Sequence, residues 1–208
     1  MKQRARWAVV VGALTVLAVS SVASAQSQDP RQWVVTRYEA VQRVLRQPGA
    51  PGSPEATARN AQASRLLNGM IDVEALGRRA LDTQWEGRSA EERQEFVGLL
   101  RQLIERSYRQ HLDQTLNYNI TYVMGDRDDA AGTATVRSTA RSRSDARAAA
   151  VNIEYRMQRR TNGWMVYDIV TNGSSLVETY RESYTRIVRE RGFAELLRRL
   201  RQRVAAST

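Results

Sequence analysis

The sequence predicts an α+β protein in which helices come before and after an antiparallel sheet of about four strands. Apolar residues recur at helical spacing from about residue 29 to residue 112, and strict alternation, which is typical of strands, takes over from residue 117 to about residue 173. Helical spacing then returns to about residue 206. The chain has 208 residues, of which 42% are apolar and only four are proline, so it suits a globular domain rather than a disordered segment.

Two helices are expected before residue 70. The first follows Asp29 and Pro30, which have the order of an N-cap and a first-turn proline, and it ends before the Pro- and Gly-rich loop 48–52. The second is expected over residues 53–69, where a new Ser-Pro-Glu start is followed by a helical pattern ending in Asn-Gly.

A short helix capped by Asp72 precedes the longest helix of the chain. Ser89 and Glu92 form a capping box, in which each side chain can bond the backbone amide of the other residue, and this predicts a helix start. Apolar residues then hold one face of the helix while charged residues hold the opposite face. The apolar face consists of Phe96, Leu99, Leu100, Leu103, Ile104, Tyr108 and Leu112.

Four strands are expected next. Three of them alternate between apolar and polar residues, and Thr161-Asn162-Gly163 is a hairpin signal between the last two. The last strand is apolar on both faces, so we expect it to be central in the sheet and covered on both sides. The expected strands are residues 118–124, 133–140, 151–157 and 164–170.

Two helices are expected after the sheet. A second capping box, Ser175 with Glu178, predicts the start of the first, and Gly192 can end it in a left-handed conformation. The segment from Arg181 to Arg203 holds eight arginines against three glutamates. This excess is consistent with attraction to anionic lipid surfaces or an acidic partner, and equally with an ordinary solvated helix face.

Residues 1–25 have the organisation of a secretory signal peptide, with cleavage expected after Ala25. Three cations precede an apolar run at 7–19, which is shorter than the ~20 residues of a membrane span. The mature chain, 26–208, would be a single domain exported to a bacterial periplasm, and the loss of three cations would lower the net charge from +10 to +7. Nucleic acid is not an expected partner in that compartment.

The residue types that several chemistries require are absent or isolated. The chain has no Cys, which excludes disulfides, thiolate nucleophiles and Cys-ligated metals. His111 is the only histidine and no nucleophile motif accompanies it, so we interpret it as a residue at a helix end. The acids within 126–129 resemble the start of a calcium loop, but Ala131 and Arg137 stand where Gly and Glu are needed, so a turn is predicted. We predict no catalytic residue and no metal site.

The aromatic residues of the sheet suggest a hollow. Tyr118, Tyr122, Tyr155 and Tyr167 place large amphipathic rings on strands that apolar helices cover. For each residue alone, core packing is a sufficient explanation, whereas together the rings could wall a cavity.

The stretch from Gly163 to Arg181 resembles the MlaC-type periplasmic phospholipid-binding proteins, also called the toluene-tolerance family. Its specific parts are Gly163-Trp164-Met165-Val166-Tyr167-Asp168-Ile169, then Gly173-Ser174-Ser175-Leu176-Val177 and Tyr180-Arg181. Supporting stretches are Ile71-Asp72-Val73, Ala80-Leu81 with Trp85, residues 96–108 and residues 151–156, so the resemblance covers about residues 30–200. The chain departs from the family pattern at Asn172 and at Ser174-Ser175.

The resemblance implies a nuclear-transport-factor-like sheet packed with a helical lobe around an apolar lipid cavity. The implied function is that of a soluble shuttle that carries phospholipids between the outer and inner membranes and so maintains outer-membrane lipid asymmetry. Its partners would be an outer-membrane lipoprotein–porin complex and an inner-membrane ABC transporter complex. We expect no cofactor other than phospholipid as cargo, and a monomer. The expected boundaries are 29–112 for the helical part, 117–173 for the sheet and 174–206 for the C-terminal helices.

The apolar faces indicate which residues would line such a cavity. Two acyl tails call for a cavity near or above ~1,000 Å³, the upper end of ordinary ligand pockets. Asp168 is expected on the strand face of Trp164 and Val166, where a lone buried carboxylate would be costly, so we expect it to pair with Arg181. The expected lining residues are Val73, Leu76, Leu100, Ile104, Tyr108, Tyr122, Val136, Ile153, Tyr155, Val166 and Leu176.

Three alternatives remain open at this level. The cargo could be another lipid such as a hopanoid, which would need a wider and shorter cavity than two acyl chains. The protein could be an isomerase or hydrolase with His111 and Asp168 as an acid–base pair. It could also be an adaptor with a solid core. Replacement of Ile104 by Arg distinguishes a cavity from a solid core. If Ile104 lines a cavity, the substitution should reduce lipid loading more than folding, whereas equal loss of both would mark Ile104 as ordinary core.

Overall fold

The structure is a computed structural model that describes residues 29–109 and 112–206, and its helices and antiparallel sheet confirm the predicted α+β class. The helices are α1 (Pro30–Leu45), α2 (Pro54–Asn68), α3 (Val73–Leu81), α4 (Ala90–Arg109), α5 (Leu176–Arg191) and α6 (Phe193–Ala205), with the short helices η1 (Asp82–Gln84) and η2 (Asp113–Asn117). The strands are β1 (Tyr118–Asp128), β2 (Thr133–Ser142), β3 (Val151–Arg160), β4 (Gly163–Thr171) and β5 (Ser174–Ser175).

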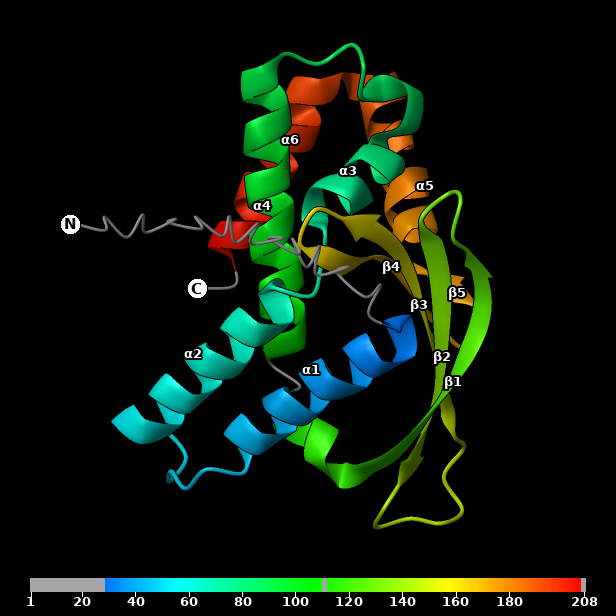
Figure 1. Cartoon of the computed structure of the whole chain (residues 1–208). Helices are drawn as coiled ribbons and strands as arrows, with labels where there is room; N and C mark the ends of the chain where they lie inside the picture. Colours follow the sequence, from blue (N-terminus) through cyan, green and yellow to red (C-terminus); the bar gives the residue numbers. More distant parts are fainter. Residues whose placement is uncertain (1–28, 110–111, 207–208) are drawn as a thin grey trace, which may run out of the picture.

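The sheet is an antiparallel meander in which each strand pairs with the next along the chain, from β1 to β5. It has one strand more than the sequence predicted, because Ser174 and Ser175 turn back onto the end of β4. The sheet is strongly twisted, and α1 lies against one of its faces (Figure 1). We call this the inner face and the opposite one the outer face.

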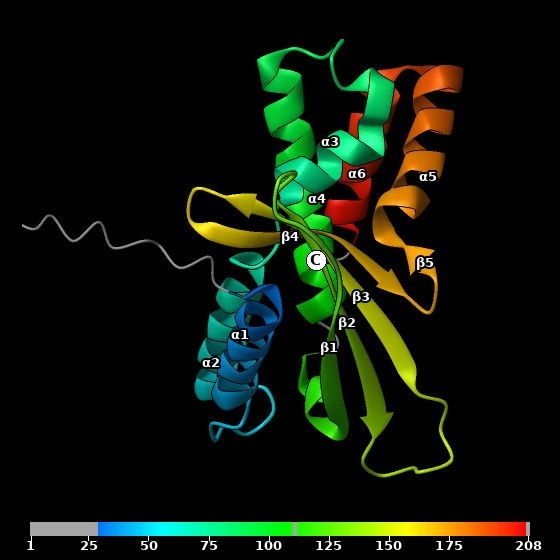
Figure 2. The ribbon, with the colours of Figure 1, turned by 45° about the vertical axis from the view of Figure 1, so that its right-hand side comes forward.

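The chain forms two packed regions. The helical lobe consists of α3, α4, α5 and α6, and the sheet lobe consists of β1–β5 with α1, α2 and η2. In the sheet lobe α1 and α2 lie side by side as an antiparallel pair, and the helices of the helical lobe stand above the sheet in the views of Figures 1 and 2. The helix α4 reaches from the helical lobe down to α2.

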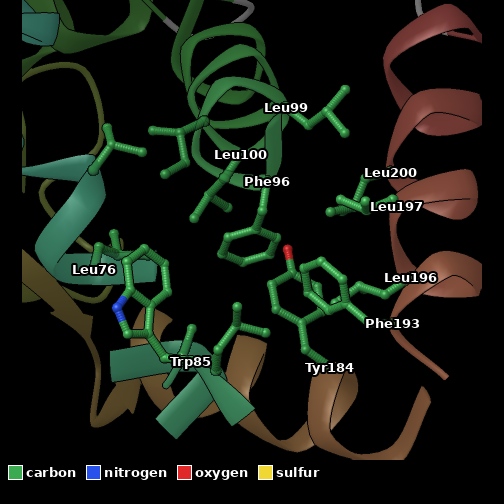
Figure 3. Packing of buried hydrophobic residues seen from close by; sticks show 14 of the residues in the cluster. Leu76, Trp85, Phe96, Leu99, Leu100, Tyr184, Phe193, Leu196, Leu197 and Leu200 are labelled. Carbon is green, nitrogen blue, oxygen red and sulfur yellow. The ribbon is translucent and has the colours of Figure 1, made fainter. Parts of the chain in front are cut away.

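The helical lobe has a closely packed core. Fifteen buried apolar residues form its main cluster, and their side chains interdigitate from all four helices (Figure 3). The ring of Phe96 meets that of Tyr184 edge to face at 5.7 Å. Gly77 on α3 lies so close to α4 that a Cβ atom there would approach the Phe96 ring to 3.0 Å. The rings and aliphatic side chains of this cluster fill the centre of the helical lobe.

The helix starts follow the predicted chemistry. The capping box at α4 is confirmed, since the Glu92 amide donates to Ser89 Oγ at 3.2 Å and the Ser89 amide donates to Glu92 Oε2 at 3.0 Å. At α5, the Glu178 amide donates to Ser175 Oγ at 3.1 Å. Each cap satisfies backbone amides that the first helical turn leaves without a partner.

The strand β4 is not central as its two apolar faces predicted. It pairs with β3 on one side, whereas its other side carries only the two residues of β5 and an isolated bridge to the segment before α3. In that bridge the Val166 amide donates to Met70 O at 2.9 Å and the Asp72 amide donates to Val166 O at 2.8 Å. The second face is apolar because α5 and α3 pack near this edge.

A β-bulge in β4 changes which of its residues share a face. Met157 pairs with Val166 and Arg156 pairs with Asp168, so Tyr167 is an extra residue without a partner on β3. Val166 and Ile169 therefore lie on the same, inner face, and Asp168 lies on the outer face. The prediction that Asp168 shares a face with Val166 was wrong, because a sequence pattern of period two does not reveal a bulge.

The predicted partner of Asp168 was also wrong. The carboxylate is 1% exposed, and it accepts hydrogen bonds from the Val177 amide at 3.0 Å and from Ser175 Oγ at 2.7 Å. Arg156 of β3, not Arg181, supplies the cation at 3.2 Å. Arg181 instead donates from Nε to the backbone carbonyl of Arg79. The buried carboxylate thus joins β4, β3 and the start of α5.

Two sequence predictions fall outside the described residues, namely the signal peptide at 1–25 and the histidine at position 111. Within residues 29–109 and 112–206, no helix combines the length and the apolar character required to cross a membrane.

Candidate functional site

The sheet lobe contains an apolar cavity of about 680 Å³ between the inner face of the sheet and the helices. This volume lies within the range of ~300–1,000 Å³ that is typical of ligand pockets. It is smaller than the sequence-based expectation for two acyl tails. The helical side of the wall consists of Val34, Tyr38, Leu67, Met70, Ile71, Tyr108, Leu112, Gln114 and Thr115. The sheet side consists of Tyr118, Ile120, Ala140, Val151, Ile153, Tyr155, Val166, Ile169 and Thr171.

The sheet side of the wall follows from strand periodicity and register. On β3, Val151, Ile153 and Tyr155 alternate onto the inner face, and the ladder sets Tyr155 beside Ile169 of β4. Ala140 of β2 pairs with Ile120 of β1, so a small residue stands where a large one would fill the space. The bulge at Tyr167 completes the wall, because without it Ile169 would face away from the cavity.

Two tyrosines support the helical side of the wall with their hydroxyl groups. Tyr108 of α4 donates to Asn68 Oδ1 of α2 at 2.6 Å and also lies 3.2 Å from the Ser64 carbonyl. Tyr38 of α1 donates to the Thr115 carbonyl of η2 at 3.3 Å. Each ring is thereby fixed between two elements while it borders the cavity. These contacts link α4 to α2 and α1 to η2.

The cavity wall is electrically neutral. Burial raises the pKa of Tyr155 to about 12 and raises the pKa of Tyr108 well above its ordinary value. Burial also raises the pKa of Tyr38, although the nearby cations Arg143 and Arg46 oppose the shift. All three phenols stay protonated at physiological pH. The wall can shelter an apolar ligand and carries no charge to bind an ionic group within it.

The cavity has one solvent-exposed end. Among its lining residues only Gln114 of η2 and Thr171 of β4 are exposed, and both lie where β1 begins and β4 ends. Thr115 adds a third polar residue beside Gln114. The opposite end is closed by the buried side chains Val34, Met70 and Val166. A ligand with an apolar part and a polar part would therefore lie with its polar part at the exposed end.

The structure brings four of the eleven predicted lining residues into this cavity and places seven elsewhere. Tyr108, Ile153, Tyr155 and Val166 line it. Tyr122 and Val136 belong to the apolar cluster of the sheet lobe beside the cavity. The other five lie in the helical lobe, where they pack against other helices rather than the sheet. These five are Val73, Leu76, Leu100, Ile104 and Leu176.

The lining residues that the prediction missed come mainly from α1, α2 and the start of β1. Val34 and Tyr38 already stood out as part of the apolar stripe of the first helix, and Ile120 as part of a strand alternation. Their periodicity marked them as buried. The sequence carried no signal that these elements, rather than α3 and α4, face the inner side of the sheet.

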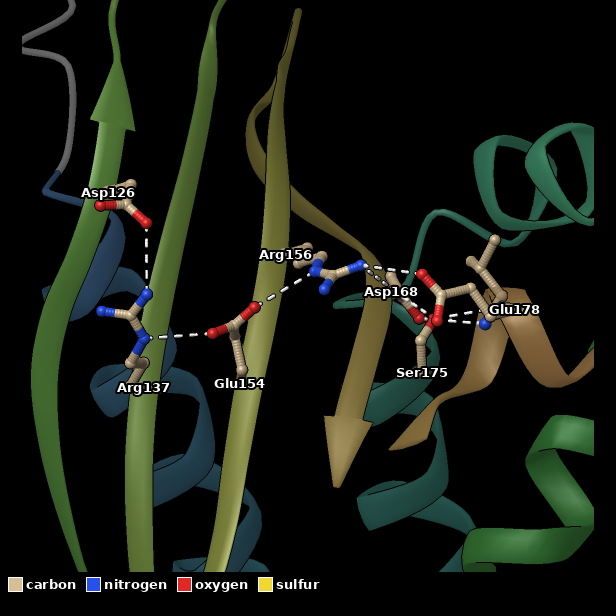
Figure 4. Close-up of polar contacts among 8 residues, drawn as sticks. Asp126, Arg137, Glu154, Arg156, Asp168, Ser175 and Glu178 are labelled. Carbon is tan, nitrogen blue, oxygen red and sulfur yellow. Dashed lines mark hydrogen bonds and ion pairs between the residues drawn. The ribbon is translucent and has the colours of Figure 1, made fainter. Parts of the chain in front are cut away.

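The outer face of the sheet is polar and carries a row of ion pairs (Figure 4). Arg137 of β2 binds both Asp126 of β1 and Glu154 of β3, at 3.2 and 3.1 Å. Glu154 also pairs with Arg156, which reaches the buried Asp168. This face offers no apolar site for a ligand.

The charged motifs noted in the sequence form internal contacts. Asp129 pairs with Arg127 and Arg159, and Asp128 Oδ1 accepts the Ala131 amide, which is the geometry of a turn. In the described parts of the chain, no group of three or more His, Asp or Glu side chains is placed to hold a metal ion.

The arginines of the C-terminal helix are partly neutralised by neighbouring acids. Arg198 and Arg199 of α6 both pair with Glu195, and Arg201 pairs with Glu95 of α4. The hydrogen bonds that Arg198 and Arg199 donate to Glu195 hold the pKa of this carboxyl at about 2. These pairs favour the interpretation of α6 as a solvated helix face that is linked to α4.

The fold and the cavity define the class of the protein. An apolar cavity with one polar, exposed end, enclosed by a twisted sheet and helices, is typical of a protein that binds an apolar ligand. The chain belongs to the MlaC family: the family model described as "MlaC protein" matches residues 36–202.

A solved structure supports the fold. The phospholipid-binding protein from Ralstonia solanacearum, determined in complex with a phospholipid, is 24% identical in sequence and superposes with a TM-score of 0.71. The similarity covers 86% of this chain and 98% of that one. A search of curated proteins found no match to the chain.

Proposed function

We propose that the chain is a periplasmic carrier that binds a phospholipid in the cavity of the sheet lobe and shuttles it between the outer and inner membranes. The observation that carries this proposal is the apolar cavity of about 680 Å³ with a neutral wall and one polar end. Membership of the MlaC family and the phospholipid complex of the R. solanacearum protein support the choice of ligand.

The energetics of acyl chains explain why a carrier needs such a cavity. Each CH₂ group exposed to water costs ~0.8 kcal/mol, so two tails with roughly 30 CH₂ groups would cost on the order of 20 kcal/mol unshielded. An apolar cavity replaces the shielding that the membrane gave. Because the cavity is smaller than two tails require, loading must be accompanied by a movement of the helical wall away from the sheet.

The cellular context of the proposal comes from the family. Residues 1–25 would direct export and be removed, and the mature protein would act as a monomer in the periplasm. It would receive or deliver phospholipid at an outer-membrane lipoprotein–porin complex and an inner-membrane ABC transporter complex. Its work would maintain the lipid asymmetry of the outer membrane.

The proposal is tested by identifying the lipid that the mature protein carries. We expect native mass spectrometry of purified protein to show a bound species, and lipid extraction to identify it as a diacyl phospholipid. We also expect transfer of phospholipid from donor to acceptor vesicles. Absence of both co-purified and vesicle-derived diacyl lipid would refute the proposal, and a bound hopanoid would replace phospholipid as the cargo.

The sheet provides a matched pair of variants for the transfer assay. In Ile153→Trp the larger ring occupies the cavity, and we expect the protein to fold but to lose most lipid loading. Val123→Trp is the control, because Val123 of β1 is 58% exposed and lies outside the cavity lining. Equal loading by the two variants would place the lipid elsewhere.

A further inference from the structure

A second hollow adjoins the cavity at its polar end, between α1 and the edge strand β1. It has a volume of about 550 Å³, and its lining includes Arg31, Tyr38, Glu39, Tyr118 and Arg143. Tyr38, Tyr118 and Ile120 border both spaces, so these three residues stand between the hollow and the cavity. We call this second space the α1–β1 hollow.

Cations predominate in the α1–β1 hollow. Arg31 and Arg143 stand against the single acid Glu39. Arg31 donates from Nε to the Tyr122 carbonyl at 3.0 Å, and this bond fixes its guanidinium over the edge of β1. Arg143 is exposed and begins the loop after β2, where its amide donates to the Asn117 carbonyl at 2.9 Å. Among the described residues, its guanidinium has no ion-pair partner.

The hollow also borders a row of backbone groups. β1 is the edge strand of the sheet, and its residues from Asn119 to Tyr122 line the hollow. An edge strand presents N–H groups that have no partner strand, and these are donors for an anionic oxygen. Guanidinium groups bind phosphate with two parallel hydrogen bonds, which makes arginine the preferred residue for such a ligand.

We propose that the α1–β1 hollow binds the phosphate of the lipid whose tails occupy the cavity, with Arg143 as the phosphate contact. Arg143 lies beside Asn117 at the polar end of the cavity, whereas Arg31 is held at Tyr122, five residues further along the chain. This inference rests on the proposed function.

A lipid with tails against Ile153 and Tyr155 places its glycerol at the polar end, within reach of Tyr118 and Tyr38. Rotation of the Tyr118 ring then joins the two spaces, so that headgroup and tails occupy adjacent compartments.

A competition between two lipids that differ only in phosphate tests the site. The mature protein is incubated with vesicles that contain a phospholipid and a diacylglycerol with identical acyl chains, and the bound lipids are extracted and quantified. We expect wild type to enrich the phospholipid. In Arg143→Ala the enrichment should fall about two- to fivefold, the effect of losing one solvent-exposed ion pair, while diacylglycerol binding is unchanged.

Arg147→Ala is the matched control. Arg147 is an exposed arginine in the same loop, and it does not line the hollow. We expect wild-type enrichment in this variant, whereas an equal fall in both variants would indicate a general charge effect and overturn the proposal. Enrichment that is absent in wild type, or that survives Arg143→Ala, would also overturn it. Failure of wild type to bind either lipid would instead refute the proposed function.

Free phosphate is the other possible source of the same chemistry. Lipid-free wild type and Arg143→Ala are compared by thermal unfolding in inorganic phosphate at low millimolar concentration. We expect no stabilisation that depends on Arg143, because a single arginine at an open surface holds a small anion weakly without the tails. A stabilisation lost in Arg143→Ala would assign the hollow to free phosphate and overturn the lipid assignment.

Discussion

The helical lobe and the sheet lobe are built from the same kinds of apolar residue, yet one is solid and the other is hollow. In the helical lobe, Phe96 of α4 packs against Tyr184 of α5 and Phe193 of α6, and Gly77 lets α3 approach closely. In the sheet lobe, the helices and the inner face enclose about 680 Å³. Apolar composition alone therefore does not decide between a core and a cavity.

The difference comes from how the facing surfaces meet. Four helices can interdigitate their side chains from several directions, so the space between them is filled at high density. A twisted sheet curves away from the helices that cover it. Trp33 and Val34 of α1 pack on the sheet, whereas the hydroxyl groups of Tyr38 and Tyr108 bond to η2 and α2. Both tyrosine rings thus border the cavity while their hydroxyl groups bond to neighbouring helical elements.

Among the variants that compare the two lobes, Ile104→Arg is expected to cause the largest loss of stability. The sequence placed Ile104 in the cavity, where the substitution would block lipid loading more than folding. The structure places it in the buried core of the helical lobe, so an unpaired charge there should cost about 4 kcal/mol or more. We expect loss of the cooperative unfolding transition and of lipid loading together. A folded Ile104→Arg protein that binds no lipid would contradict the assignment of a solid core.

A pair of alanine substitutions compares the two lobes directly. Leu100→Ala removes a side chain that is fully buried in the helical lobe, and we expect a loss of about 2–5 kcal/mol in the free energy of unfolding. Ile153→Ala removes a side chain that borders the cavity, and we expect about 1 kcal/mol or less in lipid-free protein. Urea denaturation measures both. Equal losses would mean that the sheet lobe is as solid as the helical lobe.

A smaller effect is expected at the polar junction between sheet and α5. Asp168→Asn removes the charge from a buried acceptor of three hydrogen bonds, and we expect a loss of about 1–3 kcal/mol in the free energy of unfolding. Asp126→Asn is the control in the same row of ion pairs, because its carboxylate is 92% exposed and its loss should cost less than about 0.5 kcal/mol. Similar losses in the two variants would show that burial of Asp168 does not increase its contribution to the free energy of unfolding.

The smallest effect concerns the segment that joins the lobes. Burial opposes ionisation of Asp72, but hydrogen bonds from Arg160, the Ala75 amide and Gln158 outweigh it and hold the pKa of this carboxyl below its ordinary value. Because the folded-state pKa is depressed, the stabilisation is present at neutral pH and is lost as the pH falls below about 4. Asp72→Asn should therefore reduce the loss of stability in acid. Identical pH profiles for the variant and wild type would refute this role.

The sequence predicted the elements well because their signals are local. The capping box at Ser89, the hairpin at Gly163 and the alternation of Val151, Ile153 and Tyr155 each depend on residues within a few positions of one another. Each of these features is present in the structure. The same kind of local pattern identified the buried face of α4.

The sequence did not predict in the same way which helix or sheet each apolar face packs against. The apolar stripe of α4 marks Leu100 and Ile104 as buried, but periodicity is the same whether the partner is a helix or a sheet. The bulge at Tyr167 reverses the faces of Ile169 and Asp168, and no residue type announces it. The lining of the cavity depends on both, so most of the predicted lining residues lie in the helical lobe or beside the cavity.

The central claim is that lipid tails enter the hollow of the sheet lobe and not the helical lobe. A phospholipid with a photoreactive diazirine in one acyl chain, loaded and cross-linked, reports this directly by peptide mass spectrometry. We predict cross-links in residues 34–38, 67–71, 118–120, 151–155 and 166–171, which form the cavity wall. Cross-links concentrated in residues 96–104 or 184–200 of the helical lobe would contradict the account.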